Sequence, residues 1–251
     1  MVKDPVKLFE KQIEKYRPYE AKVLMSNSYG PQLAVYINSK ISNQTLDLNI
    51  YTKENSRLRN SRFQIATHFG KYAKDLLKEK PLCRSWFNCP ERIPKNLKKY
   101  GTIIDYETNL IEGSHVNIDL VSYDGKDFYL WEVKGTGKLN DRTGLVEYNS
   151  DETLVRALLE VETYFETIVN NGNEGTFKSE IGGHLFNISN REKASIKKLV
   201  VIPKNSKIAS QISDPNCEAI REHFGIIIEE YDPVFEQIDR EKRISKIRKS
   251  L

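Results

Sequence analysis

The spacing of hydrophobic and polar positions changes near residue 61 of this 251-residue chain. From there, apolar residues recur every three to four positions and form one helix face: Ile65, Phe69, Tyr72, Ala73 and Leu76. Pro81 is expected to end this helix, because proline removes a backbone hydrogen bond. Three strands, a helix, a strand, a helix and a last strand are expected next, at residues 100–111, 116–123, 126–135, 150–172, 197–205, 214–225 and 226–233.

The helix expected at residues 150–172 has well-marked ends. Ser150 is the expected N-cap, and Asp151 and Glu152 fall in the first turn, where carboxylates interact favourably with the helix dipole. Gly172 is expected to stop the helix. A helix between strands permits a parallel crossover, whereas the three strands before it can pair as hairpins. The sequence therefore predicts an α/β fold with a mixed central sheet flanked by helices.

The first 60 residues have a weaker pattern. A polar, helix-like start is followed by three strand candidates at residues 22–27, 32–38 and 45–52, with turn-forming Asn, Ser and Gly between them. We therefore expect a small β-containing N-terminal appendage at residues 1–60. The main domain is expected at residues 61–235, followed by a basic helical tail at residues 236–251.

Composition narrows the class of protein. The chain is 39% hydrophobic and 29% charged, and no window approaches the roughly 18 unbroken apolar residues of a membrane span. Three irregularly spaced cysteines do not form a disulfide framework, and the N-terminus lacks the apolar stretch of a signal peptide, so a cytoplasmic protein is expected. Basic segments at residues 92–101 and 239–251 are compatible with a phosphate-bearing partner, although a basic run alone is more often solvated surface.

Two charges interrupt the apolar strand at residues 126–135, namely Glu132 and Lys134. The preceding Asp124-Gly125 pair favours a two-residue hairpin turn, which would set Asp119 opposite Leu130. Side chains alternate along a strand, so Asp119, Glu132 and Lys134 would then project from one face of the sheet. A four-residue loop would keep this parity, whereas an odd-numbered loop would move Asp119 to the other face.

Two carboxylates that converge on an apolar sheet need a positive partner, because burying unpaired charges is costly. Lys134 supplies one charge, and a hard divalent cation could supply another. Mg²⁺, with Mn²⁺ as a substitute, would use Asp119, Glu132 and the backbone carbonyl of Val133 as ligands. Such an ion would polarise a phosphate and activate water, while Lys134 would orient that water or stabilise developing charge. The alternative is an ion-paired cluster that caps the end of a sheet.

At these residues the chain resembles the PD-(D/E)xK nuclease superfamily, which has a restriction-endonuclease-like fold. Asp119 in VNIDLV matches the first acid of the family, although Ile118 stands where proline is common. Glu132, Val133 and Lys134 in WEVKG match its ExK element. The resemblance covers roughly residues 61–232 and implies an αβββαβ core.

Many members of this superfamily also carry a glutamate on the first core helix. No glutamate is evident on the polar face of the helix expected here, which shows Gln64, His68, Lys71 and Asp75. Glu107 or Glu112, on the first strand or just after it, could take its place. One acid fewer would favour a one-ion site over a two-ion site.

Relatives also place a Gln or Arg near the substrate on the helix after ExK, with a Tyr one turn later. The matching residues are Arg156, Glu160 and Tyr164, so Glu stands where Gln is more typical. Arg156 and Tyr164 are therefore candidate substrate-binding residues, and Arg156 could clamp a phosphate. Alternatively, Arg156 pairs with Glu152 or Glu160 at i±4.

The resemblance implies Mg²⁺-dependent phosphodiester hydrolysis, and a DNA endonuclease is the expected function. RNA as the substrate is one alternative. Another is a catalytically inactive nuclease-like fold that binds nucleic acid or a protein partner. The oligomeric state is left open, and a homodimer is compatible with the sequence.

Overall fold

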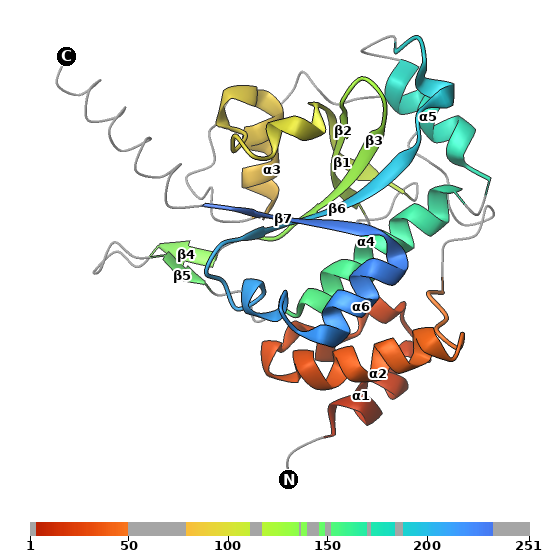
Figure 1. Cartoon of the computed structure of the whole chain (residues 1–251), viewed down its shortest axis with the longest axis vertical. Helices are drawn as coiled ribbons and strands as arrows, with labels where there is room; N and C mark the ends of the chain where they lie inside the picture. Colours follow the sequence, from red (N-terminus) through yellow and green to blue (C-terminus); the bar gives the residue numbers. More distant parts are fainter. Residues whose placement is uncertain are drawn as a thin grey trace, which may run out of the picture.

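A five-stranded mixed β-sheet forms the centre of the fold (Figure 1). The structure is a computed structural model, and it describes residues 4–49, 79–110, 117–135, 137–139, 146–148, 152–169, 172–183 and 188–232. The strand order is β1-β2-β3-β6-β7, with antiparallel pairing from β1 to β3 and parallel pairing from β3 to β7. The strands are β1 (Thr102–Asn109), β2 (Asn117–Tyr123), β3 (Phe128–Val133), β6 (Ile196–Pro203) and β7 (Ile226–Tyr231). The predicted α/β fold with a mixed sheet is confirmed.

Helices cover both faces of this sheet. Figure 1 shows α3 (Glu79–Asn88) on one face and α4 (Leu154–Val169) and α6 (Pro215–Phe224) on the other. The remaining helices are α1 (Pro5–Ile13), α2 (Gly30–Ser42) and α5 (Glu174–Gly183). Two short strands, β4 (Gly137–Leu139) and β5 (Val146–Tyr148), form a separate ribbon. Among the described helices, none combines the length and the apolar character needed to cross a membrane.

Single-turn 3-10 helices complete the described elements. Their bounds are Pro18–Glu20 (η1), Lys22–Met25 (η2), Asn27–Tyr29 (η3), Pro90–Arg92 (η4), Lys98–Tyr100 (η5), Arg191–Lys193 (η6) and Ala209–Gln211 (η7).

Strand β3 is buried along its whole length, which explains its almost unbroken apolar sequence. Phe128 and Leu130 pack into a hydrophobic cluster with α4 and α6. Trp131 and Val133 point to the opposite face and pack with Trp86 of α3. Glu132 therefore faces the α4 side of the sheet, and it is the one charged residue within the strand.

The hairpin between β2 and β3 has a longer loop than predicted. Tyr123 pairs with Phe128 and Val121 with Leu130, so four residues form the loop and the two-residue turn was wrong. The Asp124 carboxylate stabilises the longer loop, because it accepts the backbone N–H groups of Lys126 and Asp127, each at 2.8 Å. The shift is two residues, so the predicted face of each side chain is retained.

The N-terminal segment is helical, and the prediction of strands there was wrong. Residues 22–25 form η2, residues 30–42 form α2, and residues 45–49 contain no strand; residues 50–52 lie outside the described part. Short apolar runs suit a helix or a strand equally, and tertiary contacts decide between them. Leu33 and Ile37 of α2 belong to the same hydrophobic cluster as α4, so this segment is not a separate appendage.

Two predicted helix boundaries were also wrong. Pro81 does not end a helix but lies within α3, whose described part runs from Glu79 to Asn88. Helix α4 begins at Leu154, so Ser150 is not its N-cap and Glu152 precedes the helix. Thr153 takes the capping position, since its hydroxyl accepts the Arg156 N–H at 3.2 Å.

Several predictions fall outside the described residues. These are most of the helix expected from residue 61, including Gln64, His68, Lys71 and Asp75, as well as Glu112 and the basic tail at residues 236–251.

Gly101, just before β1, is expected to tolerate no side chain. Its φ of 84° and ψ of −157° suit glycine alone, and a Cβ would lie 2.1 Å from the Tyr123 carbonyl oxygen. We expect Gly101→Ala to lower the free energy of unfolding by about 3 kcal/mol or more. Gly125→Ala is the control, because it shares a positive φ of 101° but has open space around the added methyl. Urea unfolding of both variants measures the difference, and equal losses would contradict the steric argument.

Candidate active site

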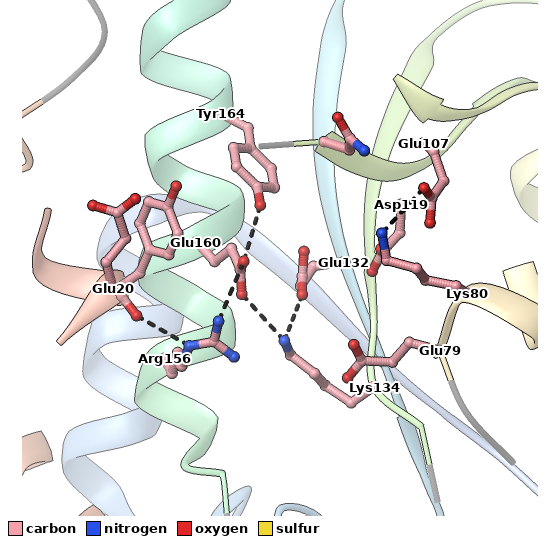
Figure 2. A pocket seen from close by; sticks show the side chains of 12 residues that line it. Glu20, Glu79, Lys80, Glu107, Asp119, Glu132, Lys134, Arg156, Glu160 and Tyr164 are labelled. Atoms are coloured by element: carbon pink, nitrogen blue, oxygen red, sulfur yellow. Dashed lines mark hydrogen bonds and ion pairs between the residues drawn. The ribbon is translucent and has the colours of Figure 1, made fainter. Parts of the chain in front are cut away.

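A cavity of about 360 Å³ lies at the edge of the sheet between α3, α4 and η1 (Figure 2). Its lining carboxylates are Glu20, Glu79, Glu107, Asp119, Glu132 and Glu160. Its lining cations are Lys80, Lys134 and Arg156. The cavity meets solvent at Lys80, whose side chain is 65% exposed. Acids thus outnumber bases around this cavity, and the three residues predicted as a site all line it.

Asp119 and Glu132 come from neighbouring strands and face the same side. Leu120 and Trp131 form the last pair of the two strands, and Asp119 and Glu132 lie one residue beyond this pair. An Asp119 carboxylate oxygen accepts the Val133 backbone N–H at 2.8 Å. The antiparallel pairing of β2 and β3 therefore fixes how the two acids approach each other.

Lys134 is the centre of a buried ionic cluster. Its side chain is 2% exposed, and its ammonium lies 2.5 Å from a Glu132 oxygen. It also lies 3.3 Å from Glu152 and 3.1 Å from Glu160 (Figure 2 draws the pairs with Glu132 and Glu160). The lysine therefore links strand β3 to the start of α4 and to its second turn.

Arg156 is held by three groups of the protein. Its guanidinium pairs with Glu152 and lies 3.7 Å from Glu160, while its Nε donates to the Tyr19 carbonyl oxygen at 3.0 Å. The predicted pairing at i±4 is confirmed. The phosphate clamp stays a prediction, although Arg156 does line the cavity. Tyr164 also lines it and donates its hydroxyl to Glu160 at 2.9 Å.

Glu79 and Glu107 face the cavity from its opposite wall. Glu79 begins the described part of α3, and one of its oxygens accepts the Gly135 N–H at 3.4 Å. Glu107 pairs with Lys80 at 3.2 Å and has a φ of 49°, which is unusual for a residue other than glycine. Backbone strain of this kind is often found at functional sites.

The ionised forms of the acids nearest β3 are destabilised. Burial raises the pKa of Asp119 well above its ordinary value, and the Glu79 charge adds to the rise. Burial and the Glu160 charge raise the pKa of Glu132 in the same way. In contrast, Lys134 and Arg156 outweigh burial at Glu160 and lower its pKa to about 2. Burial alone would lower the pKa of Lys134, but Glu132 and Glu160 raise it, so this lysine is an ammonium.

The donor chemistry suits a hard divalent cation. Asp119, Glu132 and Glu79 supply carboxylate oxygens, a ligand type that Mg²⁺ prefers. Val133, the predicted carbonyl ligand, is not among the residues that line the cavity. Burial first, and neighbouring carboxylates second, raise the pKa of Asp119 and of Glu132, so a cation bound between them would favour their charged forms. Within the described ranges, however, no three Asp, Glu, His or Cys side chains are gathered as they would be around an ion.

Sequence reasoning missed several residues of this cavity. It assigns no glutamate to the first core helix, because the polar face expected for that helix shows Gln64, His68, Lys71 and Asp75. The spacing of Leu82, Cys83 and Trp86 was the signal that a helix continues past Pro81 and carries Glu79. Tyr19 and Glu20 gave no signal, because only packing brings η1 to α4.

Comparisons with protein families, with curated proteins and with solved structures found no match for this chain.

Proposed function

We propose that this protein is a metal-dependent nuclease that cleaves phosphodiester bonds in nucleic acid, most simply a Mg²⁺-dependent DNA endonuclease. One observation carries the proposal: Asp119 and Glu132, from neighbouring strands, line the same cavity beside Lys134, and this cavity reaches solvent. This is the acid, acid and lysine arrangement that the resemblance to PD-(D/E)xK nucleases implies. The order α3-β1-β2-β3-α4-β6 supports the proposal of a restriction-endonuclease-like core.

In this proposal, Asp119, Glu132 and the Val133 carbonyl hold Mg²⁺, and Glu79 is a further acid that could share the ion. The bound ion would supply Lewis-acid stabilisation of the phosphate and would lower the pKa of a water molecule. Mn²⁺ is the expected substitute.

The residues of the chain have separate roles around that ion. Lys134 is an ammonium, so it acts as a donor that orients water or stabilises a phosphate oxygen as negative charge develops. Glu152 and Glu160 hold this ammonium next to Glu132, and Arg156 holds both glutamates. Tyr164 stays a candidate substrate-binding residue at the wall of the cavity.

Because the lining of the cavity is acidic, we expect the protein to bind the metal ion before it binds the substrate. Six carboxylates face three cations, and an uncompensated acidic cavity repels a phosphate backbone. Exposed Lys95 and Lys98, in the basic segment at residues 92–101, do not line the cavity and are candidates for contacts with phosphates farther away.

A specific observation also favours the alternative, an inactive nuclease-like fold that binds nucleic acid or a protein. The ammonium of Lys134 is almost fully buried and already paired with three carboxylates. In this reading the cluster stabilises the fold and needs no metal ion.

A cleavage assay separates the two functions. Plasmid DNA, single-stranded DNA and RNA are incubated with the protein and Mg²⁺ or Mn²⁺, with a chelator as the negative control. We expect cleavage that depends on the metal and is absent in Asp119→Asn. Binding of nucleic acid without cleavage of any of the three, at any metal concentration, would favour the inactive fold.

A further inference from the structure

Tyr19, in the N-terminal turn η1, contacts two residues of α4 that line the cavity. Its backbone carbonyl accepts the Arg156 Nε–H at 3.0 Å. Its ring packs edge-on against the Tyr164 ring, with centroids 6.0 Å apart and an interplanar angle of 73°. Tyr19 itself is only 3% exposed, so both contacts are inside the protein.

Both contacts lead to the same carboxylate. Tyr164 donates its hydroxyl to a Glu160 oxygen at 2.9 Å, and the Arg156 guanidinium lies 3.7 Å from that oxygen. The other Glu160 oxygen lies 3.1 Å from the Lys134 ammonium. A continuous set of contacts therefore runs from η1 through α4 to Lys134.

The turn that carries Tyr19 is firmly attached to the rest of the chain. The Leu24 carbonyl accepts the Thr153 N–H at 3.0 Å, directly before α4. Within the N-terminal segment, Gln12 accepts the Val23 N–H at 3.0 Å, and Glu20 accepts the Arg17 N–H at 3.0 Å. These hydrogen bonds thus hold η1 in place beside the first turns of α4.

We propose that Tyr19 is a positioning residue of the site: through Arg156 and Tyr164 it holds Glu160, and through Glu160 it holds the Lys134 ammonium against Glu132. The N-terminal segment then contributes to the site by positioning its residues through Tyr19. The effect on catalysis rests on the proposed nuclease function, whereas the effect on the position of Lys134 does not depend on it.

The test replaces Tyr19 by leucine in the full chain and follows Lys134 directly. Buried, ion-paired lysines give an ammonium NMR signal because their protons exchange slowly with water, and Lys134→Arg identifies this signal by its loss. Tyr19→Leu should shift the Lys134 signal and speed its exchange. The kcat of metal-dependent cleavage should fall by about tenfold, within the roughly 10²-fold cost of a 1 Å misplacement.

Phe9→Leu is the matched control. Phe9 is also buried in the N-terminal segment and packs edge-on against a tyrosine, Tyr36, at 6.0 Å and 74°. It makes the same kind of contact away from the cavity lining. We expect Phe9→Leu to lower the melting temperature as Tyr19→Leu does, but to leave the Lys134 signal and kcat unchanged. If the leucine variant fails to fold, Tyr19→Met is used instead, because methionine is closer to tyrosine in volume, and the same results are expected.

A double-mutant cycle tests the route of the effect. If Tyr19 acts through Glu160, then Tyr19→Leu should change kcat by less than about twofold in a Glu160→Gln background. Additive losses, or a Lys134 signal that responds equally to Phe9→Leu, would overturn the proposal. If the parent protein cleaves nothing, the nuclease function fails, and the Lys134 signal alone decides whether Tyr19 positions the lysine.

Discussion

Asp119→Asn is expected to abolish metal-dependent cleavage and, without metal, to raise the melting temperature. The substitution removes a charge from the proposed metal ligands, so cleavage should fall by at least about 10³-fold. It also removes one of the mutually repelling carboxylates, while the amide oxygen can still accept the Val133 N–H. A gain of about 1 kcal/mol would raise the melting temperature by about 2–4 °C.

The pH dependence of stability should change with the same substitution. The pKa of Asp119 is raised by burial and by the Glu79 charge, so between about pH 4 and that raised pKa the folded chain binds more protons than the unfolded chain. The free energy of unfolding of the metal-free parent should therefore decrease as pH rises through this interval. Asparagine does not titrate, so the decrease should be shallower in the variant.

Melting curves with and without Mg²⁺ measure both effects. A ligand that binds only the folded state stabilises it by about 2.7 kcal/mol at 100 times its dissociation constant, so Mg²⁺ should stabilise the parent and not the variant. Asp124→Asn is the control. Backbone N–H groups of Asp127 and Lys126 outweigh burial and lower the pKa of Asp124, so its loss should reduce stability and leave cleavage intact. If Asp119→Asn destabilises the metal-free protein and Mg²⁺ affects neither protein, the acid is structural.

Lys134→Ala is expected to have the largest effect on stability. It leaves Glu132, Glu152 and Glu160 without the ammonium that pairs with all three inside the protein. Removing one partner of a buried ion pair costs about 3–5 kcal/mol, which corresponds to a fall in melting temperature of about 10 °C. A divalent cation can replace part of the lost charge, so Mg²⁺ should restore part of this stability. Turnover at saturating metal should still be lower by about 10²- to 10³-fold.

Lys198→Ala provides the comparison for metal rescue. Lys198 is also buried and pairs with Glu162 at 2.7 Å, but neither residue lines the cavity. This variant should lose stability that Mg²⁺ does not restore. If Mg²⁺ also fails to restore Lys134→Ala, and the parent protein has no nuclease activity, the cluster around Lys134 is an element of the fold alone.

The sequence by itself determined the five strands of the central sheet and the face on which the candidate site lies. Side chains alternate along β2 and β3, so any loop with an even number of residues puts Asp119 on the same face as Glu132. The predicted face was therefore correct although the predicted loop length was wrong. Helix α6 and strand β7 could also be predicted from the sequence, because Asp214 caps the helix and Gly225 ends it in a left-handed conformation. These features depend on neighbours in the sequence or on strict periodicity.

The tertiary structure decided the features that depend on distant contacts. The apolar runs at residues 22–27 and 32–38 are too short to separate helix from strand, and packing against α4 and α6 made them helical. Besides the Thr153 cap, the start of α4 is held by hydrogen bonds to Leu24 and Gln211, which no local pattern encodes. Likewise, Glu79 and Tyr19 reach the cavity only because α3 and η1 pack beside β3 and α4, since their separation along the chain carries no information about distance in the fold.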